Sequence, residues 1–524
     1  MITSLIHILR LARAGFVLAH EGVFAKVDPG MVPASMRLPL MLSRLIARRE
    51  AKSGMNRLAI AIERLGPSYV KLGQFLATRP DVVGPQVVRD LEMLQDRMAP
   101  FGREVAVKTI EASFDRKLEE IFVELGEPVA AASIAQVHKA KVRDQHGERD
   151  VAVKILRPGV ERRFARDLSD MYFAARFAER HFAEARRLRM VEVVDTLARS
   201  VRMEMDFRLE AAAASEFGEN CEKDPDFRVP AIDWDRTSRD VLTLEWIDGT
   251  PMSDFAGLER QGYNLPSLGR TVIQSFLRHA VRDGLFHADM HPGNLFVDRQ
   301  GRLCAVDFGI MGRLGLKERR FLAEILYGFI TRDYQRVAEV HFEAGYVPSH
   351  HRVEDFAQAV RAIGEPIHSR TADQISMAKL LTLLFEITAL FDMHTRTELV
   401  MLQKTMVVVE GVARKLDPHL DMWSTADPVV RSWIEENLGP IGKLSDVGRV
   451  ASKFGRAALA LPEMLDRAER LTQRLEDATK HGFALSPASV DAIGRAEARR
   501  ARWGNAALWV IAALLGWLVL IISL

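Results

Sequence analysis

The chain has 524 residues, of which 48% are hydrophobic and 27% charged, an ordinary composition for a globular protein of two or three structural units. The balance of 72 Lys and Arg against 70 Asp and Glu, a net charge of +2, argues against a dedicated nucleic-acid-binding protein. Only two cysteines occur, Cys221 and Cys304, which excludes a disulfide framework and a four-cysteine zinc site.

The first predicted element is an amphipathic helix near the N-terminus. Arg10 and Arg13 interrupt its apolar residues and no cleavage site of small residues follows, so we do not expect a signal peptide. The apolar face fits either packing against the protein or contact with a membrane interface. Its residues recur at helical spacing: Leu5, Ile8, Leu9, Ala12, Phe16 and Val17.

More helices and a small β-rich unit follow. Residues 32–65 have helical periodicity, whereas short β-branched runs appear around residues 119–156. Residues 137–142 and 150–156 predict two strands, and the turn DQHGER between them predicts a hairpin.

The second half of the chain is mainly helical. A long charged helix is predicted over residues 162–187, and a strand that ends in a turn over residues 241–249. From Pro251 to about residue 500 helical periodicity dominates. Residues 297–309 interrupt it and predict a second short hairpin.

Residues 506–524 predict a membrane-spanning helix, because they carry no charge and Ser523 is their one clearly polar side chain. A helix of this length is about 28 Å long, close to the hydrocarbon thickness of a bilayer. A buried core helix is the alternative. The bulk of the chain is expected on the cytoplasmic side, because arginines precede the segment: Arg495, Arg499, Arg500 and Arg502.

Two motifs in the C-terminal half carry the chemistry. HADMHPGN spans His287 to Asn294, and DFG begins at Asp307. Asp289 precedes Asn294 by five residues and Asp307 by eighteen, a spacing that resembles the catalytic loop and DFG motif of protein kinases. Phosphoryl transfer needs Mg²⁺ with oxygen ligands, which Asn294 and Asp307 would supply. Asp289 would orient or deprotonate an attacking hydroxyl or water.

Upstream features match the same pattern. The VAVK strand places Lys154 where a kinase lysine pairs with the α- and β-phosphates. An Ala-rich loop stands where a kinase has its Gly-rich loop, and alanine restricts positive φ, so phosphates should be held differently. A strand ends at Glu245, Trp246 and Ile247 where a kinase hinge meets adenine. The predicted nucleotide-binding residues are Ala130, Ala131, Ala132, Ser133, Ile134, Ala135, Gln136, Val137, His138, Lys154, Glu245 and Ile247.

The HADMH segment also allows a different interpretation, a metal site with His287, Asp289 and His291 as ligands. Other enzyme signatures are absent from the sequence, namely GxGxxG, GxxxxGK[ST], HExxH, CxxC and GxSxG. The sequence therefore gives no support for a dinucleotide-binding fold, a Walker-type nucleotide-binding protein, a zincin or an α/β-hydrolase. The order of strand lysine, catalytic loop and DFG predicts a kinase-like fold.

Taken together, the motifs resemble the UbiB family, the bacterial branch of the atypical kinase-like proteins of coenzyme Q biosynthesis. The resemblance covers about residues 20–440. The family's motifs are found as KxGQ at Lys71 to Gln74, ExD at Glu204 to Asp206, the Ala-rich loop at Ala130 to Gln136, and Glu210 as the partner of the strand lysine.

This resemblance implies an α+β, bilobal protein-kinase-like fold, with an N-terminal helical extension over the cleft and a C-terminal transmembrane helix. Lys71 and Gln74 would then point toward the phosphates and the acidic Glu204 and Asp206. A cleft covered in this way excludes protein substrates but admits water or a small lipid head group. The implied catalytic residues are Asp289, Lys154, Glu210, Lys71, Gln74, Glu204 and Asp206, and the implied metal ligands are Asn294 and Asp307.

The expected domains follow from the same resemblance. They are an N-terminal helical extension with KxGQ (1–110), a kinase-like N-lobe (111–250), a helical C-lobe with the catalytic loop and DFG (251–440), a helical linker region (441–502) and a transmembrane anchor (503–524).

Three functions compete at this point. The first is a membrane-anchored, Mg²⁺-dependent ATPase or small-molecule kinase that supports ubiquinone biosynthesis and gates prenylated phenol intermediates. The second is a pseudokinase scaffold with nucleotide as a structural ligand. The third is a polyprenylphenol hydroxylase, which lacks support because no flavin fingerprint, haem-ligand motif or facial iron triad is found.

The expected cofactors are ATP or ADP and Mg²⁺, and the expected location is a bacterial-type inner membrane with the catalytic part in the cytoplasm. The expected partners are membrane lipid, prenylated phenol or quinone intermediates and other ubiquinone-biosynthesis proteins, without nucleic acid. Ala512 and Gly516 form a small-xxx-small pair that would suit a homodimer.

Overall fold

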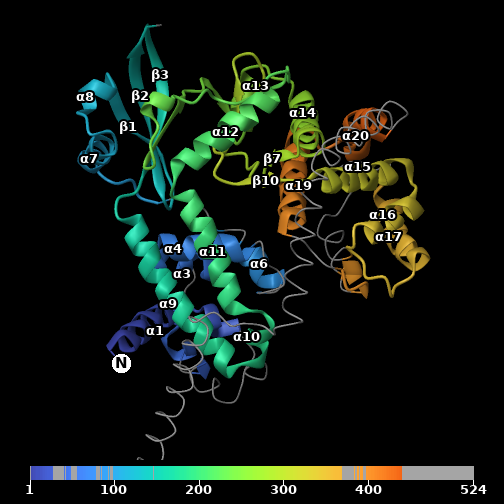
Figure 1. The fold of residues 1–524 in the computed structure, drawn as a ribbon, viewed down its shortest axis with the longest axis horizontal. Helices are drawn as coiled ribbons and strands as arrows, with labels where there is room; N and C mark the ends of the chain where they lie inside the picture. The colour runs from blue at the N-terminus through green and yellow to red at the C-terminus, as the bar shows by residue number, and fades with distance from the viewer. Residues whose placement is uncertain are drawn as a thin grey trace, which may run out of the picture. The chain divides into compact units, whose positions relative to one another are not determined.

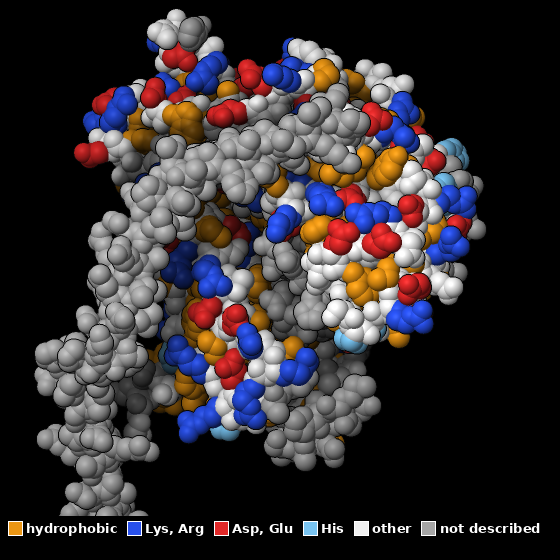
Figure 2. Space-filling view, turned by 45° about the vertical axis from the view of Figure 1, so that its right-hand side comes forward, with side chains coloured by type: hydrophobic (Ala, Val, Ile, Leu, Met, Phe, Trp, Pro, Cys, Tyr) orange, Lys and Arg blue, Asp and Glu red, His pale blue; other side chains and the backbone are white. Residues whose placement is uncertain are grey.

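The computed structural model describes residues 2–26, 56–77, 98–145, 147–368 and 397–438, with parts of 40–48, 83–94 and 383–393. The chain divides into two units, residues 1–435 and 436–524, and the candidate site lies in the first. Figure 1 shows its helices and strands, and Figure 2 shows acidic and basic side chains interspersed over one face.

The N-terminal region is helical. Asn56 caps the helix at residue 57, because its side chain accepts a hydrogen bond from the Leu58 N–H (2.9 Å). Gly73 packs so closely that a Cβ atom there would lie 2.4 Å from Leu94 Cδ1, which explains the glycine of KxGQ. The elements are α1 (Ile2–His20), η1 (Val23–Lys26), α3 (Arg57–Leu65), α4 (Pro67–Ala77) and α6 (Pro85–Leu91).

The N-terminal helix α1 forms as predicted. Of the two alternatives for its apolar face, packing against the protein is wrong. Leu5, Leu9 and Phe16 are 58%, 62% and 56% exposed, whereas the small residues Ala14 and Ala19 are buried. Small side chains permit the close approach of α1 to α3 and α9. The large apolar side chains therefore lie on the outer face of the helix.

The first sheet is antiparallel throughout, with the strand order β1-β2-β3-β5. The predicted hairpin is confirmed, since β2 and β3 pair from Ala135↔Leu156 to Asp144↔Gly147. One face buries Val151, Val153 and Ile155 against Ile110 of α7. Figure 1 shows α7 and α8 beside the strands β1 (Glu124–Ala131), β2 (Ala135–Asp144), β3 (Gly147–Leu156) and β5 (Val241–Glu245), with α7 at Arg103–Phe114 and α8 at Leu118–Ile121.

Helices that lie between β3 and β5 in the sequence share a core with the other face of this sheet, and α12 contacts β5. The predicted charged helix is confirmed, but Phe182 has an extended backbone and divides it. Phe164, Phe207 and Leu242 pack in one core with the Ala-rich loop. The helices are α9 (Val160–His181), α10 (Ala183–Arg187), α11 (Met190–Glu204) and α12 (Phe207–Cys221).

The C-terminal half of the first unit contains two small sheets. One has the order β4-β9-β8-β6 and includes the predicted second hairpin, β8 and β9; the other pairs β10 with β7. The strands are β4 (Phe227–Arg228), β6 (Gly249–Pro251), β7 (Leu285–His287), β8 (Leu295–Asp298), β9 (Leu303–Ala305) and β10 (Met311–Arg313), with the short turn η3 at Trp234–Arg236.

Helices pack around these sheets and hold the HADMHPGN segment. Buried Thr405 of α19 donates a hydrogen bond to the Ala288 backbone oxygen (3.0 Å), next to the HADMH aspartate. The helices are α13 (Phe255–Arg260), α14 (Leu265–Arg278), the π-helical turn η4 (His279–Asp283), α15 (Leu316–Thr331), α16 (Tyr334–Glu343), α17 (Val353–Ile367), α19 (Thr397–Leu416) and α20 (Met422–Leu438).

Among the helices of the described residues, none combines the length and the hydropathy needed to cross a bilayer. The predicted anchor at residues 503–524 and the linker at residues 441–502 lie outside the described residues.

Candidate active site

The site is built around the lysine of the VAVK strand. Side chains alternate along β3, so Lys154 lies on the opposite face from the buried Val153 and Ile155. Its Nζ donates to both oxygens of Glu210, at 2.8 and 2.9 Å, and to Asp307 Oδ1 at 3.3 Å. Sequence positions far apart thus meet at one ammonium group.

These charges stabilise one another. Although burial alone would lower the pKa of Lys154, Asp307 and Glu210 hold it above its usual range. Desolvation would likewise raise the pKa of Asp307, but Lys154 and the Gly309 N–H, 3.0 Å from Oδ1, hold it well below its usual range. The site therefore contains an ammonium and a carboxylate, both ionised at neutral pH. The Phe308 N–H also donates to Glu210 (3.3 Å) and ties the DFG segment to α12.

The predicted catalytic loop begins at the end of β7. His287 is buried, which lowers its pKa, and its Nδ1 accepts a hydrogen bond from the Asp289 N–H (3.1 Å). The opposite ring nitrogen, Nε2, contacts the Asp307 backbone oxygen. A neutral imidazole protonated at Nε2 satisfies both contacts. His287 therefore links the catalytic loop to the DFG segment.

The alternative metal site of His287, Asp289 and His291 is not formed in the described part of the chain. The ligand atoms of these three residues do not converge there. His287 uses both ring nitrogens in the contacts above, and exposed His291 accepts the Gly293 N–H through Nδ1 (3.1 Å). Both histidines therefore make hydrogen bonds with backbone atoms of the loop and the DFG segment, and these bonds fix the loop conformation.

The oxygen atoms of Asn294 and Asp307 fit a divalent cation. Asn294 donates through Nδ2 to the backbone oxygen and to Oδ2 of Asp289, both at 3.1 Å, so its own Oδ1 is left as an acceptor. Among the described residues, the hydrogen bonds that the Asp307 carboxylate accepts all use Oδ1. The pairing of Leu295 with Ala305 brings both residues to the same end of the β8–β9 hairpin. One carboxylate and one amide oxygen are ligands that Mg²⁺ accepts.

The Ala-rich loop lies at the turn between β1 and β2. Ala131 pairs with Gln136, and the Ala132 N–H donates to the Ala135 oxygen (2.8 Å), which closes a tight hairpin. Ser133 is fully buried. Met98 donates its N–H to the Ala131 oxygen (3.1 Å). The turn is therefore held by residues outside the sheet.

Buried polar side chains beside this loop explain two further predicted residues. The Phe101 N–H donates to Gln136 Oε1 (2.9 Å), and Gln136 Nε2 contacts His138 Nε2 (2.8 Å). His138 Nδ1 donates to the Gly126 oxygen (2.8 Å), so Nε2 accepts from Gln136. Gln136 and His138 support the loop from within the fold, whereas Ala130 is exposed and Ile134 is part of the core.

The predicted hinge follows β5. Glu245 Oε2 contacts Arg228 and accepts the Ala231 N–H (3.2 Å), so its carboxylate is directed to the β4 segment. Trp246 donates its N–H to the Asp150 oxygen (3.3 Å). Ile247 is half-buried. Sequence reasoning missed Arg228, because no motif links it to the hinge.

The KxGQ and ExD motifs meet through one ion pair. Lys71 Nζ of α4 lies 2.6 Å from Glu204 Oε2 at the end of α11, and the two side chains are 12% and 14% exposed. Asp206 instead caps α12 and pairs with Arg208 (2.7 Å). Gln74 is half-buried and makes no hydrogen bond among the described residues. The structure joins Lys71 to Glu204 and leaves Asp206 directed elsewhere.

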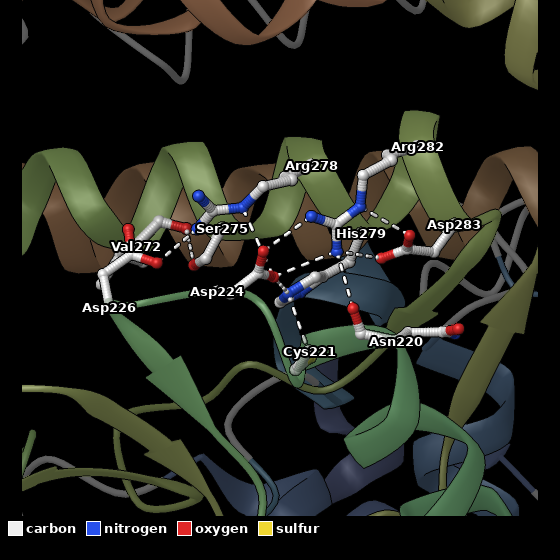
Figure 3. A network of polar contacts seen from close by, with 10 residues as sticks. All are labelled: Asn220, Cys221, Asp224, Asp226, Val272, Ser275, Arg278, His279, Arg282 and Asp283. Carbon is white, nitrogen blue, oxygen red and sulfur yellow. Dashed lines mark hydrogen bonds and ion pairs between the residues drawn. The ribbon is translucent and has the colours of Figure 1, made fainter.

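A buried polar network holds the segment that leads into the HADMHPGN loop (Figure 3). His279 Nε2 lies 3.3 Å from Cys221 Sγ and 3.2 Å from Asp224 Oδ2. Asp224 also accepts from Arg282 (2.6 Å), which with His279 holds its pKa well below the usual range despite burial. The network connects α12 to η4, directly before β7. Nothing in the sequence points to it, because its members are isolated residues that the fold brings together.

Two domain families match this chain, and the first includes Lys154, Glu210, the HADMHPGN loop and the DFG segment. The ABC1 atypical kinase-like domain matches residues 93–341, and the UbiB helical domain matches residues 360–421. The kinase-like fold expected from the sequence is thereby confirmed.

Curated relatives match most of the chain. "Probable protein kinase UbiB" of Marinobacter nauticus is 37% identical over 90% of this chain and 84% of its own length. The proteins of the same name from Pseudomonas entomophila and Azotobacter vinelandii are 38% and 39% identical, over 84% and 76% of this chain and 81% and 75% of their own lengths. Among solved structures, the complex of Rv3197 with erythromycin from Mycobacterium tuberculosis aligns with a TM-score of 0.47 and 23% identity, over 75% of this chain and 97% of that chain.

Proposed function

Because this chain belongs to the UbiB family of ABC1 atypical kinase-like proteins, we propose that it is a Mg²⁺-dependent ATPase or small-molecule kinase at a membrane. The observation that carries the proposal is Lys154, which pairs with Glu210 and Asp307 at the same time. Kinases need this lysine–glutamate pair and the DFG aspartate together for phosphoryl transfer.

Each side chain has a role in this proposal. Lys154 holds the α- and β-phosphates of ATP, while Asn294 and Asp307 hold Mg²⁺. When bound, Mg²⁺ supplies positive charge that neutralises the phosphate oxygens. Asp289, fixed by Asn294, accepts the proton of the attacking hydroxyl or water. The tight Ala-rich turn and the strand end at Glu245 border the nucleotide.

We further propose that the acceptor is small. The Lys71–Glu204 pair joins the helical extension to the end of α11, one turn before α12 and Glu210. As the family resemblance implies, an extension held over the cleft would exclude a protein chain and would admit water or a lipid head group. The family points to ubiquinone biosynthesis, in which nucleotide turnover would gate the transfer of prenylated phenols from the bilayer to other enzymes of that biosynthesis.

Two features support association with an inner membrane. Residues 503–524 form the proposed single anchor, and the exposed apolar side chains Leu5, Leu9 and Phe16 of α1 form a second contact. Removal of residues 503–524 should release the protein into the soluble fraction. If the truncated protein still sediments with membranes, α1 is the dominant contact.

The decisive experiment is phosphate release from Mg-ATP by the purified protein. It is measured with and without anionic liposomes and a prenylphenol analogue, beside the Asp307→Asn variant. Turnover that rises with lipid or phenol and is lost in the variant supports the proposal.

The second candidate, a pseudokinase scaffold, is favoured by one observation. The Ala-rich turn is tied to residues 98–101 by backbone and side-chain hydrogen bonds, so its freedom to follow a phosphate is small. Tight nucleotide binding without turnover under every condition would select the scaffold.

A further inference from the structure

A groove of about 780 Å³ lies between the helices α9 and α11, which run side by side in Figure 1. Most of its lining comes from one face of α9, and further side chains come from α11 and from His7 of α1. Sites for small molecules usually have volumes of about 300–1,000 Å³. None of the described lining residues belongs to the proposed nucleotide or Mg²⁺ site. The groove is therefore a candidate for a second ligand.

The floor of this groove is apolar. Phe164, Ala198 and Met205 line it and are only 1%, 4% and 5% exposed. Phe177 lines it as well but is 54% exposed, with its ring centroid 4.2 Å from that of His181. An apolar ligand that covered Phe177 would remove this surface from water, which is a favourable change.

The rim of the groove is basic. Arg176, Arg180 and Arg202 line it and are exposed, and none of the three forms an ion pair among the described residues. Arg176 lies over the ring of Tyr172, 5.6 Å from its centroid. Arg202 donates through Nε to the Ala198 oxygen of its own helix (3.1 Å). The remaining N–H groups of these guanidinium groups are available to an anion.

The carboxylates around the groove are already engaged. Glu161 is the one acidic side chain among the described lining residues, and it is paired with Arg239. Asp195 of α11 accepts a hydrogen bond from the Tyr172 hydroxyl (2.5 Å). The groove therefore has an excess of positive charge along its rim, next to an apolar floor.

We propose that this groove binds a single molecule of an anionic lipid, with its head group among the arginines and its chains on the apolar floor. Guanidinium groups form paired hydrogen bonds with phosphate and carboxylate oxygens. A free anion would leave Phe177 uncovered, and a neutral hydrocarbon would take Arg202 out of water without a partner. A bilayer surface would reach the exposed rim but not the buried Phe164. An amphiphile with an anionic head group satisfies both parts of the groove.

The test uses the full-length protein in nanodiscs of neutral phosphatidylcholine, with empty nanodiscs titrated as a blank. Calorimetry compares three water-soluble probes, namely dihexanoyl phosphatidic acid, dihexanoyl phosphatidylcholine and inorganic phosphate. The phosphatidic acid should bind saturably. The other two retain only the chains or only the anion, so they should bind about tenfold or more weakly. Equal affinity for any two of the probes, or no saturable binding of phosphatidic acid, would overturn the proposal.

Variants test which side chains hold the lipid. Arg202→Gln should weaken the binding of phosphatidic acid by about tenfold, and Phe177→Ser by about fivefold. The matched controls are Arg199→Gln and Met203→Ser, at exposed positions of α11 that do not line the groove. Both controls should bind as wild type does. Unchanged affinity in both groove variants, or an equal loss in the controls, would contradict the assignment.

Hydrogen exchange locates the ligand without any substitution. Phosphatidic acid should slow exchange in α9 and α11 of the wild-type protein, because the lipid would bridge the two helices. It should leave α16 and α17 unchanged, since neither helix lines the groove. Protection that is confined to helices other than α9 and α11 would place the lipid elsewhere and overturn the proposal.

Discussion

Lys154 Nζ lies 2.8 Å from Glu210 Oε1, although the two residues are 56 positions apart and belong to a strand and a helix. In kinases this contact marks the arrangement that is ready for phosphoryl transfer. Here it is formed with both carboxylate oxygens, and the Phe308 N–H completes it. The strand, the helix and the DFG segment are thus assembled around one buried ion pair.

The substitution Lys154→Met should destabilise the fold as well as abolish nucleotide binding. It leaves the buried carboxylate of Glu210 without its cation, which typically costs about 3–5 kcal/mol. The double variant Lys154→Met/Glu210→Gln should recover part of this loss, because residue 210 then carries no buried charge; the loss of the Asp307 contact with Lys154 remains in both variants. Urea unfolding of wild type, the two single variants and the double variant measures the coupling. Strictly additive losses would show that the two side chains do not interact.

The substitution Asp307→Asn should weaken magnesium-nucleotide binding by about tenfold or more, since an anionic oxygen ligand is lost. Calorimetry with Mg²⁺ and a non-hydrolysable ATP analogue measures the effect. The matched control is Asp248→Asn, which changes an aspartate that is 66% exposed and paired with Arg299. Equal affinity in wild type and Asp307→Asn would remove Asp307 from the metal ligands.

Much of this site is predictable because its motifs are local. Alternation along VAVK gives the face of Lys154, and the spacing from Asp289 to Asn294 closes a loop with its own hydrogen bonds. Other contacts depend on how distant elements pack. The Arg228–Glu245 pair joins a strand of one sheet to the end of another, and no periodicity reports it.

The two alternatives for α1 stayed open in the sequence for a similar reason. Helical periodicity shows that Leu5, Leu9 and Phe16 share a face, but it does not show which face the protein covers. The small side chains of Ala14 and Ala19 permit a closer approach, so the helix packs through them. Asp206 is a second example: its motif predicted a place beside Lys71, whereas the start of α12 needs a cap and Arg208 supplies a cation.

The substitution Lys71→Ala should loosen the helical extension without unfolding the kinase-like domain. Glu204, 14% exposed, would lose its partner, and α4 would lose its charged link to α11. Hydrogen exchange should therefore accelerate in residues 67–77. The reversed pair Lys71→Glu/Glu204→Lys should restore part of the protection, whereas Lys117→Ala, at an exposed lysine, should change nothing there. Unaltered exchange in Lys71→Ala would contradict a structural role for the pair.

The substitutions Ala131→Gly and Ala132→Gly should change nucleotide affinity or permit self-phosphorylation. Glycine adds about 0.5–1 kcal/mol of backbone freedom to the turn, which corresponds to about two- to fivefold in binding. Fluorescent nucleotide titration and incorporation of labelled phosphate measure the two outcomes. Ala112→Gly, on the exposed face of α7, controls for a general loss of stability. If neither loop variant differs from wild type, the turn does not contact nucleotide.

The two cysteines should be unreactive in the native protein. Cys221 and Cys304 are 3% and 0% exposed, and burial raises the pKa of Cys221 and raises that of Cys304 to about 12. Since the thiolate is the reactive form and a raised pKa keeps the thiol protonated up to higher pH, neither should form thiolate at pH 8. A chromogenic disulfide reagent should therefore label no thiol in the folded protein. It should label two in about 6 M guanidinium chloride, which unfolds domains of ordinary stability. Rapid labelling of one thiol under native conditions would show that the network around His279, or the β9 strand, opens readily.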